Sequence, residues 1–148
     1  MEYLIFSVVT VAVILFIFIQ GKLDEQKQLR LFMQTLRENK GKVPDKEYKI
    51  ERFVRIPGYF EKHQEGFQID DITWNDLGMD EVFCRINYSI SATGDEVLYH
   101  MLRTPCMEIT KLKHFHEMAE FFQNNDDERL QYQSFMKKLG TTGKYALD

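Results

Sequence analysis

The longest uncharged run in the chain restricts its architecture more than any other feature. Seventeen residues without a charged side chain, YLIFSVVTVAVILFIFI, extend from Tyr3 to Ile19. As a helix this run is roughly 25 Å long, close to the lower limit for crossing the hydrocarbon core of a bilayer. We therefore expect residues 1–21 of the 148-residue chain to form a transmembrane anchor.

A cleaved signal peptide and a buried core helix are the alternatives to an anchor. A signal peptide carries positive charge before its apolar run and small residues at a cleavage site. Only Glu2 and the α-amino group precede this run, and no A-x-A-like pattern follows it. The basic side chains come after the run, at Lys22, Lys27, Arg30, Arg37, Lys40 and Lys42. The positive-inside rule then predicts a single-pass cell-membrane protein with its N-terminus outside and its C-terminal domain in the cytoplasm.

A polar helix is expected to continue from the span, because an apolar stripe runs between Lys22 and Asn39. The stripe has helical spacing and consists of Leu29, Phe32, Met33 and Leu36. It is expected to rest on the chain's own domain or on a partner, and a short coiled-coil dimer is the alternative. The basic residues favour weak attraction to anionic lipid headgroups, which nearby acidic residues dilute. Gly41 and Pro44 predict the end of this helix.

The rest of the chain predicts short helices joined by turns. Pro57-Gly58 marks a turn, and a short extended segment is expected at residues 69–77. Its expected buried side chains are Ile69, Ile72, Trp74 and Leu77. A helix should follow from Met79, burying Met79, Val82, Phe83 and Ile86. The next should begin at a capping box of Thr93 and Glu96, bury Val97, Leu98, Met101 and Leu102, and end before Pro105.

Two further helices complete the expected fold. The first should start at Thr110 and carry the stripe Leu112, Phe115, Met118, Ala119 and Phe122. A break is expected at residues 124–126, and the second helix should carry Tyr132, Phe135, Met136 and Leu139 before a Gly140 cap. The predicted fold class is therefore mostly α: a transmembrane helix, a juxtamembrane helix and a small helical core with a short extended segment.

Charge and residue chemistry favour no catalytic, cofactor-binding or metal site. The net charge of −4, from 19 basic and 23 acidic residues, argues against a strongly basic nucleic-acid surface. Asp70, Asp71 and Asp76 lack the spacing of a calcium loop, so they are expected to cap helices or face solvent. His114 and His116 point about 200° apart on a helix and cannot chelate one ion together. Cys84 and Cys106 are expected to be free cytosolic thiols.

The chain also lacks the short motifs of common enzymes. Neither a phosphate loop nor a G-x-G-x-x-G turn occurs, and no G-x-S-x-G, H-E-x-x-H or C-x-x-C pattern is present. We therefore expect no catalysis by these residues.

Two stretches, IDDITWNDLGMDEVFCRIN and SATGDEVLYHMLRTP, carry a resemblance to the core of the MutS mismatch-repair family. The similarity is to membrane-associated MutS-like proteins of Gram-positive bacteria. Their core has a glycine before a helix that ends in L-R-x-P, and the corresponding positions here are Gly94, Leu98, Leu102, Arg103 and Pro105. The next family element, leading into the lever, is partly matched by Leu112, Met118 and Phe121. His116 stands where a basic residue is usual.

The resemblance covers residues 59–140, roughly half of the chain, and its motifs belong to the scaffold. Together with the apolar run and the polar helix, it divides the chain into four expected parts: an anchor at 1–21, a juxtamembrane helix and linker at 22–58, a MutS-core-like region at 59–140 and a truncated tail at 141–148. The expected function is a membrane-anchored scaffold fragment of a MutS-like DNA-processing ATPase. ATP, magnesium and DNA are expected only for a full-length protein. The expected partners of this chain are the lipid bilayer and either the remaining MutS-like domains or a dimer partner. The alternative is a stand-alone membrane-tethered protein-interaction module.

Overall fold

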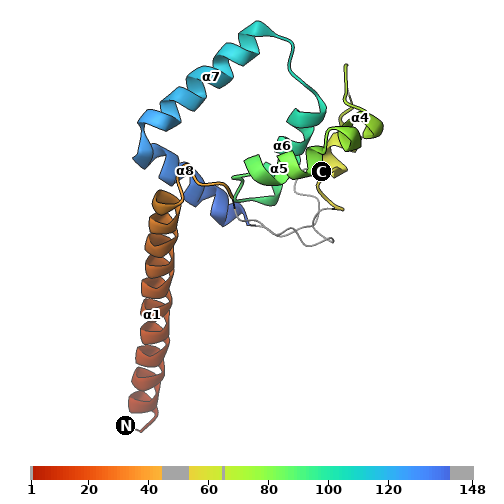
Figure 1. Ribbon diagram of the computed structural model, residues 1–148. Coiled ribbons are helices and arrows are strands. Elements are labelled where there is room, and N and C mark those ends of the chain that lie inside the picture. Colours follow the sequence, from red (N-terminus) through yellow and green to blue (C-terminus); the bar gives the residue numbers. More distant parts are fainter. Residues whose placement is uncertain (1, 45–53, 65, 141–148) are drawn as a thin grey trace. The chain divides into compact units, whose positions relative to one another are not determined.

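A computed structural model describes residues 2–44, 54–64 and 66–140 (Figure 1). Every regular element among these residues is a helix, which confirms the mostly α prediction. The chain divides into two units, Met1–Lys40 and Gly41–Asp148, each of which is described by itself.

The first unit is one long helix. α1 (Glu2–Glu38) runs without a break through both the predicted span and the predicted juxtamembrane helix. It is long and apolar enough to cross a membrane, and its apolar side chains, such as Phe6, are exposed. Thr10 donates its hydroxyl to the carbonyl of Ser7 at 2.8 Å, so this polar group is satisfied inside the helix. Just after α1, Gly41 has a φ of 78°, consistent with the predicted glycine stop.

The second unit contains a small core built from four helices. These are α3 (Gly58–Lys62), α4 (Asp71–Asp76), α5 (Met79–Ile86) and α6 (Ala92–Arg103). α3 and α5 pack on α6, and α4 packs on α5. The buried residues are mostly aromatic, namely Ile56, Phe60, Trp74, Phe83 and Tyr99. The Tyr99 ring lies 4.8 Å from Trp74 and about 6 Å from Phe60 and Phe83 (centroids 6.0 and 6.1 Å), so it is the centre of the core.

The prediction of an extended segment at residues 69–77 was wrong, because Asp71–Asp76 form the short helix α4. Asp70 is the N-cap of α4 and accepts a hydrogen bond from the backbone N–H of Thr73 at 2.7 Å. A helix turns about 100° per residue, so only part of the apolar set can face the core. Trp74 is buried, whereas Ile72 and Leu77 are exposed.

The buried face of α6 also differs from the prediction. The N-cap is Ser91 and not the predicted Thr93. The Ser91 hydroxyl accepts a hydrogen bond from the N–H of Gly94 at 3.1 Å. The inward side chains are Asp95, Glu96, Tyr99 and Arg103. Leu98 and Leu102 are partly buried, whereas Val97 and Met101 are exposed. On α5, likewise, Phe83 is buried while Val82 and Ile86 are exposed.

The last two helices form a hairpin whose break was predicted correctly. α7 (Ile109–Asn124) and α8 (Asp126–Leu139) are separated by Asn125 and pack on each other. The rings of Phe122 and Tyr132 meet edge to face, with centroids 5.3 Å apart. α7 begins after Glu108 and not at Thr110, since the N–H of Leu112 already bonds the Glu108 carbonyl at 3.0 Å.

Neither predicted stripe of the hairpin is buried. α7 buries no side chain, and Leu112, Phe115 and Met118 are exposed. On α8 the buried residues are Leu130 and Ser134, and the expected Tyr132, Phe135 and Met136 are exposed. Apolar spacing identified the helices, but a stripe is buried only where another element covers it. Gly140 ends α8 with a φ of 82°, as predicted, and the tail at 141–148 lies outside the described residues.

Candidate functional site

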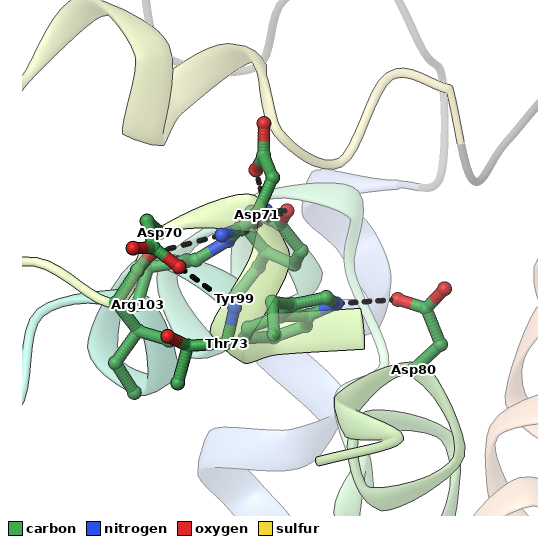
Figure 2. A network of polar contacts seen from close by, with 8 residues as sticks. Asp70, Asp71, Thr73, Asp80, Tyr99 and Arg103 are labelled. Atoms are coloured by element: carbon green, nitrogen blue, oxygen red, sulfur yellow. Dashed lines mark hydrogen bonds and ion pairs between the residues drawn. The ribbon is translucent and has the colours of Figure 1, made fainter. Parts of the chain in front are cut away.

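Arg103 lies at the centre of a network of hydrogen bonds in the core, shown in Figure 2. It is the last residue of α6, and its side chain is only 7% exposed. Its Nε and Nη2 donate to the Tyr99 hydroxyl at 2.9 and 2.8 Å. Nη1 donates to the Ile69 carbonyl at 2.9 Å, and Nη2 to Asp71 Oδ1 at 2.6 Å. We call Arg103 with Ile69, Asp71, Trp74 and Tyr99 the Arg103 node.

Aromatic rings enclose the guanidinium. Its central carbon lies 4.4 Å from the Trp74 ring centroid and 5.3 Å from those of Phe60 and Tyr99. A cation against such faces is stabilised by the ring quadrupoles, and more strongly when water is excluded. The Trp74 indole N–H donates in turn to Asp80 Oδ1 at 2.8 Å. A buried charge is therefore held by rings and hydrogen bonds together.

The protonation of these groups follows from their surroundings. Burial opposes the charge on Arg103, but hydrogen bonds to Tyr99 and Asp71 outweigh burial and raise the pKa of the guanidinium. Burial raises the pKa of Tyr99, which its bond from Arg103 partly offsets. Asp71 is 86% exposed, so solvent screens its ion pair with Arg103.

Arg103 has little capacity left for an external ligand. A guanidinium carries five N–H donors, and four of them are used by the four bonds within the node. The reverse bond, from the N–H of Ile69 to the Arg103 carbonyl at 2.8 Å, ties the same two residues a second time. The arrangement fastens the start of α4 to the end of α6, and it does not present an anion-binding surface.

A second buried polar group supports the start of α6. Asn87 donates its side-chain N–H to Asp95 Oδ1 at 2.7 Å, and its amide oxygen accepts from the N–H of Ser89 at 2.8 Å. A Cβ added at Gly94 would lie 3.0 Å from Ser89 Cβ and Oγ. The loop therefore approaches α6 at Gly94 so closely that a larger residue would displace it.

The positions that carry the family resemblance have different places in the structure. Gly94 lies against Ser89 of the loop before α6. Leu98 and Leu102 pack against the core, and Arg103 bonds Ile69. Pro105 follows the end of α6. The α7 positions Leu112, Met118 and Phe121 are exposed, and so is His116. The Arg103 node was missed by the sequence interpretation. Its available signal was the helical i, i+4 spacing of Tyr99 and Arg103.

The aspartates and cysteines considered as candidate site residues do not form a reactive or metal-binding site among the described residues. Asp70 caps α4, and the bond from Thr73 lowers the pKa of its carboxyl. Within the described residues no three His, Cys, Asp or Glu side chains gather as metal ligands. Cys84 and Cys106 are free, half-buried thiols. Burial, with Asp80 and Glu81 nearby, raises the pKa of Cys84 and disfavours the reactive thiolate.

No protein-family model, curated protein or solved structure matches the chain.

Proposed function

We propose that this chain is the membrane anchor and the first core scaffold of a MutS-like DNA-processing ATPase, without catalysis of its own. The observation that carries the proposal is the place of the L-R-x-P segment. Arg103 of that segment joins α4 to α6 through four donated hydrogen bonds. At Gly94, the other distinctive position, an added Cβ would lie 3.0 Å from the side chain of Ser89, which would have to shift. Two residues that carry the resemblance are thus also two on which this small core depends.

The proposed role is mechanical. The Arg103 node fixes the direction in which the chain leaves α6 at Thr104, because side chain and backbone of Arg103 are both bonded to Ile69. α7 and α8 follow as the next scaffold helices. Nucleotide and DNA chemistry would reside in other domains of a full-length protein and concern no residue of this chain.

The first experiment is to read the reading frame beyond the codon for Asp148. The proposal expects an open frame that encodes G-x-x-x-x-G-K-[ST] several hundred residues downstream, as a MutS-like ATPase domain requires. A genuine stop codon with no ATPase frame following it would contradict the proposal.

The bilayer is the proposed partner of α1, with the N-terminus outside and the second unit in the cytoplasm. Asn87-Tyr88-Ser89 is an N-glycosylation acceptor sequence, so the chain carries its own topology reporter. In microsomes, glycans are added to the lumenal side during translocation, before Asn87 can be buried by folding. The proposed orientation expects an unmodified, alkali-resistant membrane protein, whereas a Ser89-dependent glycan would show the opposite orientation.

A stand-alone membrane-tethered interaction module is the second candidate. The observation that favours it is the exposure of apolar side chains on both helices of the hairpin, including Phe115, Phe121 and Phe135. Large exposed apolar side chains clustered on one element are typical of binding surfaces. A stop codon after Asp148, together with a folded chain, would favour this candidate over the first.

A further inference from the structure

Tyr88 forms a hydrogen bond that joins distant parts of the sequence. Its hydroxyl donates to the backbone carbonyl of Lys42 at 2.6 Å, and the two residues are 46 positions apart. Lys42 comes shortly after the end of α1 at Glu38. Both bonded residues belong to the second unit. The bond therefore attaches the first residues of that unit to the loop before α6.

The loop holds Tyr88 in place through the residues on either side of it. Asn87 is fully buried and donates to Asp95 of α6 at 2.7 Å. Ser89 donates its N–H to the Asn87 side chain at 2.8 Å and lies against Gly94 of α6. Tyr88 itself is half exposed. The bond to Lys42 is thus made from a loop that is fixed to the start of α6.

The segment that Tyr88 holds has little else to attach it. Among the described residues, the bond from Tyr88 is the one hydrogen bond that joins residues 41–44 to another part of the second unit. Lys42 and Val43 are exposed. Further along the chain, the next described residue that the core buries is Ile56. Attachment of this segment therefore depends on the Tyr88–Lys42 bond.

The bond shortens the tether between α1 and the attached part of the second unit. Lys42 follows Glu38 by 4 residues, and an extended chain of that length reaches about 14 Å at most. Ile56 follows Glu38 by 18 residues, and the corresponding limit is about 60–65 Å. One hydrogen bond thus separates a short tether from a long one.

We propose that the Tyr88–Lys42 bond is a conformational switch that controls how far the second unit can move from the end of α1. A single neutral hydrogen bond favours its formed state by only about two- to twelve-fold, so the short and the long tether are both populated. The bond does not depend on the proposed MutS-like role. Only its effect on the reach of the second unit from a bilayer rests on the proposed anchor.

The first experiment detects the open state by limited trypsin digestion of the full chain in detergent micelles. Trypsin cleaves after lysine and needs the carbonyl of that lysine for its oxyanion hole. Cleavage after Lys42 therefore follows the population in which Tyr88 does not bond that carbonyl. Tyr88→Phe keeps the ring but lacks the hydroxyl, so it should accelerate this cleavage about three-fold or more. Peptide mass spectrometry measures the rate at each site.

Tyr132→Phe is the matched control, because Tyr132 is exposed to a similar extent and is not bonded to Lys42. Cleavage after Lys113 of α7 is the internal reference, and circular dichroism checks that each variant folds. Unchanged cleavage after Lys42 in Tyr88→Phe would overturn the proposal. So would acceleration by Tyr88→Ala without acceleration by Tyr88→Phe, because packing of the ring and not the hydroxyl would then hold the segment.

The second experiment measures the length of the tether. Spin labels at Glu38→Cys and at the native Cys106, in a chain that carries Cys84→Ser, report the distance between the two units by double electron–electron resonance. Tyr88→Phe should broaden the distance distribution and extend it to longer distances, while Tyr132→Phe leaves it unchanged. Equal distributions in the parent chain and in Tyr88→Phe would overturn the control of reach. That result would not affect the MutS-like role, which the reading frame beyond Asp148 tests separately.

Discussion

At the scale of single residues, the Arg103 side chain bonds Tyr99, Ile69 and Asp71 at once. A lysine would keep the charge but could not donate to Tyr99, Ile69 and Asp71 together. We expect Arg103→Lys to lower the free energy of unfolding by about 2 kcal/mol or more, because buried acceptors lose their donors. Urea unfolding of the full chain in detergent, followed by the fluorescence of Trp74, measures the change.

Arg85 provides the control for that measurement, because it lies on α5 of the same core and is exposed. Arg85→Lys should change the free energy of unfolding by less than about 0.5 kcal/mol. Equal effects at the two positions would show that the node does not stabilise the fold.

The thiol of Cys84 offers a second test at this scale. Burial raises its pKa, as do the neighbouring carboxylates of Asp80 and Glu81, so little thiolate forms at neutral pH. We expect iodoacetamide to modify Cys84 more slowly in the folded chain than in urea, and the folded rate to rise only at alkaline pH. Peptide mass spectrometry after timed labelling follows the site. Rapid labelling of folded Cys84 at pH 7 would contradict the assigned burial.

At the scale of elements, α4 depends on one cap. The bond from the N–H of Thr73 lowers the pKa of Asp70 in the folded state. Stability from this bond is therefore fully present above the unfolded pKa and is lost as pH falls through the lower folded pKa. We expect wild-type stability to decline more steeply below about pH 4 than that of Asp70→Asn, in which the cap remains but does not titrate. Urea midpoints measured at pH 7 and at pH 3 compare the two chains. Identical pH dependence would contradict the role of Asp70.

Local chemistry explains which element boundaries could be predicted. Gly41, Asn125, Gly140 and the Pro57-Gly58 turn act through their own backbone preferences, and the structure has a break or turn at each. The mostly α class followed from helical spacing in the same way. The start of α6 was predicted at Thr93 and lies at Ser91, because hydroxyl residues two positions apart could each act as N-cap, and the Ser91 hydroxyl is the one that accepts a backbone N–H, that of Gly94.

Burial could not be predicted from apolar spacing alone. On α6 the core takes in the polar residues Asp95 and Arg103, whose partners lie outside the helix: Asn87 in the preceding loop, and Ile69, 34 residues before Arg103. Met101 meets no such neighbour and is exposed. The Arg103 node depends on this kind of long-range pairing, which one sequence does not encode as a pattern. Helix identity is local, whereas the choice of buried face belongs to the assembled core.

At the scale of the whole molecule, α1 is the proposed membrane anchor. It is long and apolar enough to span a bilayer. We expect the full chain to remain in the membrane fraction after alkaline extraction, and Ile14→Arg together with Val11→Arg to release a large share of it. Each arginine near the centre of a span costs about 2.5–3.5 kcal/mol on insertion scales. Exposed Lys22→Arg is the control. A wild-type chain that stays soluble without detergent would contradict the anchor.

The double tie between Ile69 and Arg103 also has a consequence for how quickly the core assembles. It joins residues 34 positions apart, and closing a loop of that length costs about 3 kcal/mol in chain entropy. α5 and α6 lie within that loop and can begin to form before its ends meet. We therefore expect the bonds between Ile69 and Arg103 to form after the transition state for folding. Weakening the bonds between Ile69 and Arg103 would then accelerate unfolding far more than it slows folding. The bonds between Ile69 and Arg103 would thus determine the lifetime of the folded core.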